Sequence, residues 1–371
     1  MQFQINRDVL LKSLAIAHNI IERKNTLPIL SNVLLEIKNS KLNVIATDLD
    51  LLFLDEISDF KIEKEGSTTT SATVLYDILK KLPANTEVSF ALQNENKLNI
   101  SADKSKFNLL CLPVDNFPNL NESFSTDGLN INGTKFLSLL NKTKISMSND
   151  ETRHYLNGIY IHLTESEKKS YLTGVATDSH RLSSSSISLN KADNFKPFIL
   201  PKKTVFQLCN LIQDNNDDVV LKSSETKIQF QIGKSKIISK VIDGKFPDYK
   251  KVVPQNNQKI LKVDTKDFIN SVERVITVSI DRKEGVKIAL KKDQIELFVN
   301  SSSSGEGKEN LKASYNSEDL TVGFNSRYLL DIASEIKDQK LIMNLNDSVS
   351  PVLIQDNSDT NSYFVIMPMK I

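Results

Sequence analysis

The stretch "VIATDLDLL" (residues 44–52) is echoed further along the chain by "GVATDSHRL" (residues 174–182), and the two copies lie 130 residues apart. In each copy a run of strand-forming residues ends at Ala-Thr-Asp. Similar segments at a long interval are typical of chains built from tandem structural units. We therefore interpret Ala-Thr-Asp as the end of a hairpin strand in two such units. A duplicated catalytic signature is the less favoured alternative.

Two helical patterns recur in the same order and indicate three units. In the first pattern, mostly apolar residues follow at i, i+4, i+7 and i+11, on one face of a helix. This pattern begins at Leu10, Phe136 and Phe268. Four positions before each start stands a residue that favours helix N-caps, namely Asn6, Asn132 and Asp264. The second pattern has apolar residues at i, i+3, i+4 and i+7, and it begins at Leu75, Val205 and Leu329.

The segments between these helices have the alternation and turn residues of β-hairpins. The order of the patterns therefore predicts an α+β fold of three tandem repeats, each with two helices and about eight strands. Polar stretches between the repeats suggest where one ends and the next begins. The predicted domains are residues 1–125, 126–255 and 256–371.

The composition is typical of globular domains, with 39% hydrophobic and 25% charged residues. The formal net charge is only +1, so a nucleic acid would have to meet positive charge concentrated on one face. The N-terminal segment lacks the features of a signal peptide, and no run of about 18 apolar residues is present. We expect a cytoplasmic protein that does not span a membrane.

Residue types that usually carry catalysis or bind metal ions show no matching pattern. Cys111, Cys209 and the four histidines lack the spacing of metal ligands. The chain contains neither a P-loop nor a GxGxxG motif. Ser179 and His180 are neighbours on an expected strand, where successive side chains point to opposite faces. We therefore expect no metal, no cofactor and no enzymatic activity.

Five runs carry a family resemblance that extends from the first helix to the last residue. They are "NTLPILSNVLLEI", "RHYLNGIYI", "VATDSHRL", "VIDGKFPDYKKVVP" and "VIMPMKI". In these runs the chain resembles the bacterial sliding clamp, the β subunit of the DNA polymerase III holoenzyme. The resemblance implies three repeats of the DNA-clamp fold that form half of a closed ring, with sheets outside and helices facing the hole. It implies a head-to-tail homodimer that encircles duplex DNA and tethers the replicative polymerase.

The same resemblance implies a set of partners. They are double-stranded DNA bound without regard to sequence, a second copy of the chain, the catalytic subunit of the replicative polymerase, an ATP-dependent clamp loader, and other polymerases and repair proteins with clamp-binding motifs. The alternative that stays open is a scaffold protein that binds peptide motifs without encircling DNA.

By resemblance, partner peptides would bind a groove formed by the second and third repeats. Its residues would be Tyr155, Leu156, Thr177, His180, Arg181, Leu182, Pro247, Lys251, Val252, Val365, Ile366, Met367, Pro368 and Met369. Apolar walls suit leucine or phenylalanine side chains, while His180 and Arg181 offer hydrogen bonds to peptide carbonyls or a glutamine amide. Methionines re-pack easily, which suits a groove with several partners.

Some positions depart from what is common in the family. Ser179 stands where glycine is common, Lys251 and Lys370 stand where arginine is common, and Pro351 lies near the groove. Lysine cannot reproduce the planar fork of arginine. We expect these departures to shift partner affinity and to leave the groove in place.

The DNA-facing positions are expected to carry cations that bind phosphates without reading bases. The candidates are Lys12, Arg23, Lys24, Lys142, Lys144, Arg153, Lys202 and Lys203. Asp150 and His154 also align with DNA contacts of the family, although they differ from the polar and aromatic residues usual there.

The resemblance further implies a dimer interface between the first repeat of one chain and the third repeat of the other. Phe107 and Leu109 would meet Thr277 and Val278. The facing stretch "NSSSSGEGKEN" (residues 300–310) is poorer in carboxylates than is usual in the family. We therefore expect a weaker or more salt-tolerant interface.

Overall fold

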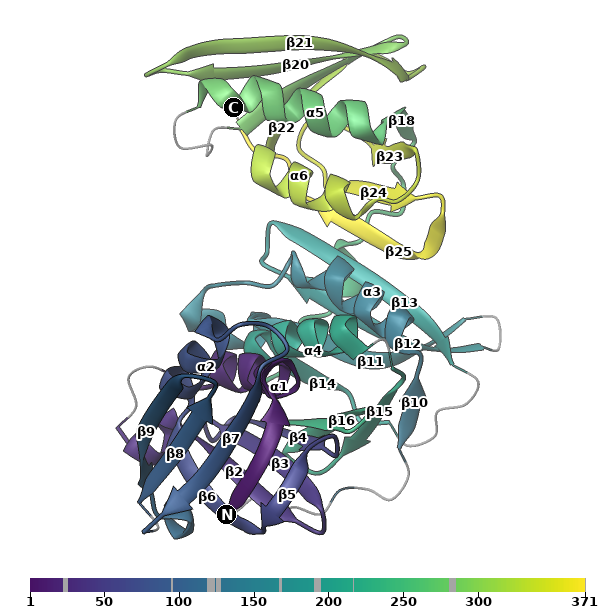
Figure 1. The fold of residues 1–371 in the computed structure, drawn as a ribbon. Coiled ribbons are helices and arrows are strands. Elements are labelled where there is room, and N and C mark those ends of the chain that lie inside the picture. Colours follow the sequence, from purple (N-terminus) through teal and green to yellow (C-terminus); the bar gives the residue numbers. More distant parts are fainter. Residues whose placement is uncertain are drawn as a thin grey trace. The chain divides into compact units, whose positions relative to one another are not determined.

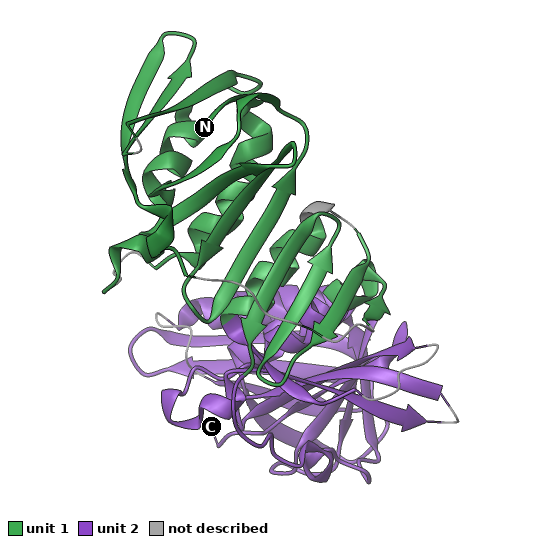
Figure 2. Ribbon diagram, turned by 90° about the horizontal axis from the view of Figure 1, so that it is seen from below, with its two compact units in different colours: residues 1–137, 203–241 green, residues 138–202, 242–371 purple. Residues whose placement is uncertain are grey.

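The structure is a computed structural model. It describes residues 1–22, 26–94, 96–118, 124, 128–166, 169–189, 195–215, 217–279 and 285–370. Contacts divide the chain into two compact units, which are residues 1–137 with 203–241 (unit 1) and residues 138–202 with 242–371 (unit 2) (Figure 2). Each unit contains one continuous antiparallel sheet.

The described residues form six α-helices and 25 strands. The helices follow one another in three pairs, as the sequence predicts: α1 (Arg7–Ile20) and α2 (Ala72–Lys81), α3 (Gly133–Lys144) and α4 (Lys202–Asn215), and α5 (Thr265–Val275) and α6 (Ser326–Glu335). Helices α1 and α2 lie side by side, as do α5 and α6 (Figure 1). None of the helices in the described ranges is both long enough and apolar enough to cross a lipid bilayer.

The first helix of each pair begins at its predicted cap. The side-chain oxygens of Asn6, Asn132 and Asp264 accept backbone N–H groups from the first turns of α1, α3 and α5, at 2.9, 3.0 and 2.9 Å. The cap predictions are confirmed. The helix ends differ from the pattern, because Met147 and Ser279 lie beyond the last turns of α3 and α5. Both residues are nevertheless buried, and a 3-10 turn (Ile276–Val278) follows α5.

Unit 1 holds a 13-stranded sheet. In spatial order its strands are β10 (Leu129–Ile131), β15 (Val219–Ser223), β16 (Lys227–Ile232), β17 (Ser235–Lys240), β4 (Leu51–Ile57), β3 (Lys41–Thr47), β2 (Asn32–Lys38), β6 (Gly66–Ser71), β9 (Ser105–Leu112), β8 (Lys97–Ala102), β7 (Glu87–Gln93), β1 (Gln2–Asn6) and β5 (Lys61–Lys64). The apolar face of α1 packs on this sheet, and Leu10, Leu14 and Ala17 have no exposed surface.

Unit 2 holds a 12-stranded sheet. In spatial order its strands are β14 (Phe198–Pro201), β11 (Gly158–Ser166), β12 (Lys169–Thr177), β13 (Arg181–Leu189), β25 (Asp359–Ile366), β24 (Val352–Asp356), β23 (Lys340–Leu345), β18 (Lys259–Asp264), β21 (Gly305–Ser314), β20 (Gln294–Ser301), β19 (Gly285–Lys291) and β22 (Leu320–Asn325). Helix α5 packs on β20 and β21 through Phe268 and Val272, which are fully buried.

One strand pair in each sheet joins one repeat to the next. In unit 1, β4 pairs with β17, and Asp55 lies opposite Ser235. In unit 2, β13 pairs with β25, and Ser185 lies opposite Ser362. Both junctions use the strand that follows Ala-Thr-Asp in one repeat and the last strand of the next repeat. The two junctions are therefore equivalent in construction.

Among the described strands inside the two sheets, β9 and β21 each have one edge that pairs with a neighbour only at its end. Strand β9 pairs with β8 along its length but with β6 only at Cys111 and Leu112. Strand β21 pairs with β20 along its length but with β18 only at Ala313 and Ser314. Unpaired N–H and C=O groups along an edge are a ready template for pairing with another chain. Residues 105–110 and 305–312 are therefore available for strand pairing.

Candidate functional site

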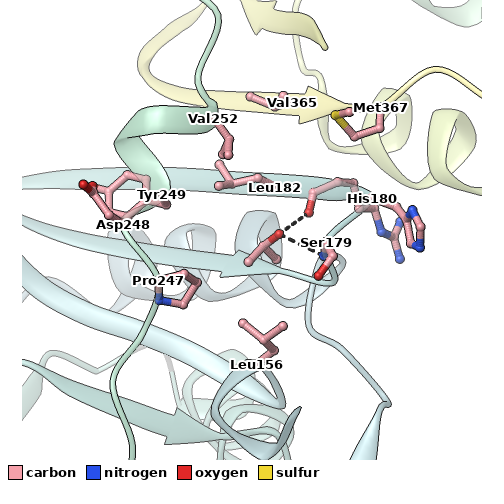
Figure 3. Close-up of a pocket in the computed structure, with 12 residues that line it drawn as sticks. Leu156, Ser179, His180, Leu182, Pro247, Asp248, Tyr249, Val252, Val365 and Met367 are labelled. Carbon is pink, nitrogen blue, oxygen red and sulfur yellow. Dashed lines mark hydrogen bonds between the residues drawn. The ribbon is translucent and has the colours of Figure 1, made fainter. Parts of the chain in front are cut away.

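A cavity of about 250 Å³ opens in unit 2. It is lined by Leu156, Thr177, Ser179, His180, Arg181, Leu182, Pro247, Asp248, Tyr249, Val252, Val365 and Met367 (Figure 3). Most of the residues predicted for the peptide groove are therefore brought together around one hollow. Ser179, Asp248 and Tyr249 were not among the predicted groove residues.

The other predicted groove residues are not part of the cavity lining: Tyr155, Lys251, Ile366, Pro368 and Met369. For Ile366 the prediction is corrected by its place in the sheet. Successive residues of a strand point to opposite faces. Val365 packs in the apolar cluster behind the cavity, whereas Ile366 is fully buried in the core of the third repeat.

The cavity is apolar because it lies over a small hydrophobic cluster. Leu182 of β13 and Val365 of β25 are opposite each other in the sheet and are both buried. Leu156 and Phe246 belong to the same cluster. Val252 remains 51% exposed at the cavity. An apolar hollow with a partly exposed wall fits the aliphatic or aromatic side chains of a peptide.

The Ala-Thr-Asp segment shapes the loop at the cavity rim. The Asp178 carboxylate accepts the backbone N–H groups of His180 and Arg181, at 3.0 and 2.9 Å. The Thr177 hydroxyl donates to the carbonyl of Arg181 and accepts the N–H of Ser179. Threonine and aspartate thus satisfy the backbone of a tight turn.

The first repeat contains the same turn. The Asp48 carboxylate accepts the N–H groups of Asp50 and Leu51. The Thr47 hydroxyl donates to the carbonyl of Leu51 and accepts the N–H of Leu49. The repeated motif is therefore a structural turn, and this prediction is confirmed.

The residue after the aspartate has a left-handed backbone in both turns. The φ angle is +78° at Leu49 and +77° at Ser179, a region that favours glycine. At this position the second turn has a side-chain contact that is not recorded for the first. The Ser179 hydroxyl accepts a hydrogen bond of 2.5 Å from Arg153, whose Nε also donates to Asp150 at 2.8 Å. This contact ties the predicted DNA-facing loop to the rim of the cavity.

Glycine substitutions at these two positions should separate backbone strain from the side-chain bond. Leu49→Gly is expected to stabilise the fold by about 1 kcal/mol, because it removes the cost of a left-handed side-chain residue. Ser179→Gly removes the same cost but also a hydrogen bond of about 1 kcal/mol, so its net effect should be close to zero. Urea unfolding of both variants measures the difference. An equal gain in both would show that the bond to Arg153 contributes nothing.

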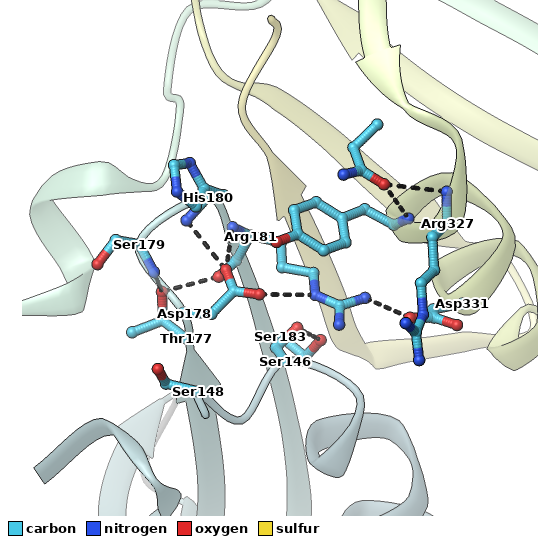
Figure 4. A network of polar contacts seen from close by, with 12 residues as sticks. Ser146, Ser148, Thr177, Asp178, Ser179, His180, Arg181, Ser183, Arg327 and Asp331 are labelled. Carbon is cyan, nitrogen blue, oxygen red and sulfur yellow. Dashed lines mark hydrogen bonds and ion pairs between the residues drawn. The ribbon is translucent and has the colours of Figure 1, made fainter. Parts of the chain in front are cut away.

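Arg181 is engaged inside the protein. It is only 9% exposed, and its guanidinium lies 3.0 Å from Asp178 and 2.7 Å from Asp331 on α6 (Figure 4). The guanidinium carbon is also 4.2 Å from the centre of the Tyr328 ring. Two of its five N–H donors thus hold the rim loop against α6, and the expectation that Arg181 also donates hydrogen bonds to a peptide stays a prediction.

His180 keeps its side chain exposed at the rim, while its backbone carbonyl accepts the N–H of Met367 at 2.8 Å. This bond fixes the segment that follows β25 beside the loop. The imidazole of His180 is thus the rim group that matches the prediction of a polar contact to a bound peptide.

Tyr249 forms a wall of the cavity and is held from behind by His162. The Tyr249 hydroxyl lies 3.1 Å from Nε2 of His162, and Nδ1 of His162 lies 3.0 Å from the carbonyl of Leu163. Burial raises the pKa of Tyr249 and lowers the pKa of His162, so both side chains are neutral at pH 7. The tyrosine hydroxyl then donates to the imidazole, and this bond holds the orientation of the Tyr249 side chain. A lone tyrosine in "FPDY" gives no sequence signal for this role.

The predicted DNA-facing residues have different surroundings. Lys12 is exposed on α1. Lys202 bonds Asn149, Lys203 lies 2.5 Å from the Asp48 carboxylate, and Lys144 lies 2.6 Å from Asn141. Arg23 and Lys24 lie outside the described residues.

Lys142 does not fit the prediction of a DNA contact. Its side chain is 2% exposed, and its ammonium lies 2.5 Å from the Asp359 carboxylate and 3.4 Å from the Ser362 hydroxyl. A buried and paired ammonium is not available to a phosphate. The prediction is corrected, and Lys142 is a structural residue between α3 and β25.

Two further aligned positions have clear local roles. Asp150 accepts hydrogen bonds from Thr152 and from Arg153, which lower its pKa to about 2. Nε2 of His154 lies 3.1 Å from the carbonyl of Asp243. Asp150 thus stabilises the turn that precedes Leu156, and His154 connects that turn to the segment of Asp243.

The residues predicted for a dimer interface lie on or beside the two free edges. Phe107 and Leu109 alternate on β9 with the exposed residues Lys106, Asn108 and Leu110. Thr277 is exposed, and Val278 is half-buried in the 3-10 turn after α5. The alternation gives β9 a half-buried apolar face beside its unpaired edge.

Three family models match consecutive parts of the chain. They describe the N-terminal domain of the DNA polymerase III beta subunit over residues 1–121, its central domain over residues 130–248, and its C-terminal domain over residues 250–370. Together they account for nearly the whole sequence.

Individual relatives agree with the family models. The beta sliding clamp of Caulobacter vibrioides is 36% identical over 373 residues, which cover 100% of both chains. The crystal structure of a sliding clamp from Bartonella birtlesii bound to griselimycin is 39% identical, with a TM-score of 0.95 and 100% coverage of both chains. A Pseudomonas aeruginosa sliding clamp bound to griselimycin is 30% identical, with a TM-score of 0.91 and 100% coverage of both chains.

Proposed function

Since the chain belongs to the DNA polymerase III beta subunit family, the bacterial sliding clamps, we propose that two copies join head to tail in a closed ring around duplex DNA. The protein itself is a non-enzymatic DNA sliding clamp. In the proposed ring it tethers the catalytic subunit of the replicative polymerase and other DNA-processing proteins, and an ATP-dependent clamp loader opens it.

The free edges of β9 and β21 carry this proposal. Within the chain, consecutive repeats already join by antiparallel pairing of one edge strand with another, at β4 with β17 and at β13 with β25. The first repeat offers β9 and the third repeat offers β21 for a further joint of the same kind. A head-to-tail contact of this type is heterologous, and it generates a ring when the rotation closes.

Holding DNA by enclosure agrees with the charge of the chain. The net charge is +1, so strong electrostatic adhesion to DNA is not expected. A few cations, such as Lys12, Arg153 and Lys203, are enough to keep phosphates centred without gripping them. Contacts to phosphates alone carry no sequence information, which allows sliding.

The cavity in unit 2 is the proposed binding site for partner peptides. A peptide with a dissociation constant of about 1 μM has a binding free energy of about −8.2 kcal/mol. A partner that is held near the same DNA experiences an effective concentration of about 1 mM. Such a partner stays bound most of the time, yet it exchanges readily with competitors. A pocket of modest size therefore suits a platform shared by several proteins.

Topology provides the test of this function. The protein is loaded on nicked circular DNA with a bacterial clamp loader and ATP, and the complex is separated from free protein by gel filtration. We expect the protein to remain on circular DNA and to leave after a restriction enzyme linearises it. Linear DNA whose ends are blocked by bound streptavidin should retain the protein, because it can no longer slide off.

A scaffold that binds peptides without encircling DNA would give a different result. Its retention would depend on salt and DNA length, and linearisation would have no effect. Release from circular and linear DNA at the same rate would overturn the proposed ring.

A further inference from the structure

The joint between the first and second repeats contains a carboxylate that accepts two serine hydroxyls. Asp55 of β4 lies opposite Ser235, the first residue of β17. The Ser235 hydroxyl donates to one carboxylate oxygen of Asp55 at 2.6 Å, and the hydroxyl of Ser13 on α1 donates to the other. One serine comes from the helix below the strand, and the other comes from the neighbouring repeat.

The joint between the second and third repeats keeps the serine of the last strand. Ser362 of β25 lies opposite Ser185 of β13, and their hydroxyl oxygens are 3.0 Å apart, within hydrogen-bond distance. Both joints inside the chain therefore place a serine of the last strand at the same register position, within hydrogen-bond distance of the residue opposite. The residue opposite, Asp55 or Ser185, comes from the strand that follows Ala-Thr-Asp.

Glu309 occupies the equivalent acceptor position on the free edge of β21. Glu309 lies opposite Leu297 of β20, as Asp55 lies opposite Val44 of β3, and both Leu297 and Val44 are fully buried. The hydroxyl of Ser271 on α5 donates to Glu309 at 2.7 Å, as Ser13 does to Asp55. The hydrogen bond from the helix serine to the strand carboxylate is therefore already present at β21.

Ser105 occupies the equivalent donor position on the free edge of β9. Ser105 and Ser235 both open the second strand of a hairpin with two loop residues, where they lie opposite Ala102 and Ile232. Each stands in the middle of a Lys-Ser-Lys sequence. Ser105 is half-buried.

We propose that Ser105 of a second copy donates its hydroxyl to Glu309 and so fixes the register of the strand pair between subunits. This inference rests on the proposed ring. Arg274 binds both carboxylate oxygens of Glu309, at 2.5 and 3.0 Å, and holds the side chain in place. A carboxylate offers about four lone-pair sites, so it can accept one more hydrogen bond besides those from Arg274 and Ser271.

The register that follows places large residues opposite glycines. With Ser105 opposite Glu309, Phe107 faces Gly307 and Leu109 faces Gly305. Residues directly opposite in an antiparallel pair share a face of the sheet. A Cβ atom on Gly307 would lie 2.8 Å from the carbonyl oxygen of Val275, so this face has no room for a side chain of its own. The ring of Phe107 then lies beside the 3-10 turn that contains Thr277 and Val278.

A cysteine pair tests the register directly. Opposite Cα atoms in antiparallel strands are about 4.5–5.5 Å apart, within the range that a disulfide spans. Ser105→Cys combined with Glu309→Cys is expected to give a covalent dimer on mild oxidation. Asp55→Cys with Ser235→Cys is the matched control, since the same register position should crosslink within one chain. The natural residues Cys111 and Cys209 are buried.

A pair shifted by one residue, Lys106→Cys with Glu309→Cys, places the two thiols on opposite faces and should give little covalent dimer. A higher yield from the shifted pair than from the Ser105 pair would overturn the register. A protein that sediments as a monomer at all concentrations would instead overturn the ring. The two failures are therefore distinguishable.

The hydroxyl itself is tested by Ser105→Ala. Loss of a hydrogen bond to a charged group weakens binding by about tenfold at each contact. Two contacts per ring give about a 100-fold rise in the dimer dissociation constant, measured by analytical ultracentrifugation. Asn108→Ala, on the outward face of β9, is the control and should change it less than threefold. Equal effects of both variants would contradict the assigned bond.

Discussion

Replacing Asp359 by alanine is expected to destabilise unit 2 by about 3–5 kcal/mol, because the buried ammonium of Lys142 would lose its ion-pair partner. Lys142 is 2% exposed, and Asp359 is its only carboxylate partner among the described residues. The Ser362 hydroxyl donates to Asp359 at 2.7 Å and lies 3.4 Å from the ammonium. Removal of the aspartate leaves the Ser362 hydroxyl as the nearest polar partner of the ammonium, while the carboxylates of Glu335 and Asp356 interact with its charge from farther away.

The double variant Lys142→Met with Asp359→Ala is the control for this prediction. Replacing both members of a buried pair by apolar residues is often neutral or stabilising. We expect the double variant to recover most of the lost stability. Urea unfolding at one fixed protein concentration measures all three proteins. A loss below 1 kcal/mol for Asp359→Ala alone would show that Lys142 finds another partner or reaches water.

The pair also makes stability depend on pH. Burial by itself would raise the pKa of Asp359, but the hydrogen bonds from Lys142 and Ser362 outweigh it and lower the pKa below its usual value. A lowered folded-state pKa stabilises the fold above the unfolded-state value of about 3.9, and this contribution is lost as the pH falls through the folded-state pKa. The wild type should therefore lose stability below about pH 4 more steeply than Lys142→Met with Asp359→Ala.

Replacing Arg181 by methionine is expected to cost about 2–4 kcal/mol of stability and to weaken peptide binding more than tenfold. The substitution leaves Asp178 and Asp331 without their guanidinium partner and releases the rim loop from α6. The loop then loses the fixed conformation in which Thr177 and His180 line the cavity. Binding of a fluorescent pentapeptide, with glutamine at one end and leucine and phenylalanine at the other, measures the second effect.

Asp331→Asn separates the two possible roles of Arg181. This variant keeps the bond between Arg181 and Asp178 but weakens the link to α6. If Arg181 acts by positioning the rim loop, Asp331→Asn should reduce both stability and peptide affinity, each by less than Arg181→Met does. An Arg181→Met protein with unchanged stability and abolished peptide binding would show instead that the guanidinium contacts the peptide directly.

The elements that the sequence predicted best are those in which local pattern and burial agree. The caps Asn6 and Asp264 lie at helix starts, and the spacing from Leu10 marks the buried face of α1. The Ala-Thr-Asp turn was interpretable because its threonine and aspartate act on backbone groups only a few residues away. Hydrogen bonds between residues close in sequence can be predicted from a short sequence motif.

The roles of Arg181 and Lys142 were not predictable in the same way. Both are charged residues that in sequence resemble free cations, and both are paired with acids more than 100 residues away, Asp331 and Asp359. Such a partner is visible only once β13 and β25 lie together. The role of Tyr249 was not predictable for a similar reason, since its partner His162 lies on β11, 87 residues away in the sequence. Long-range pairing decides which charges stay on the surface.

The unpaired edges of β9 and β21 also determine how the protein would assemble if the angle between its repeats were changed. A heterologous contact closes only when successive turns add up to a full circle, and otherwise each added chain presents the same open edge as the last. A small change of twist at either internal joint would therefore yield a growing fibre. Closure of the proposed ring therefore depends on the angle between repeats as well as on the side chains at the contact.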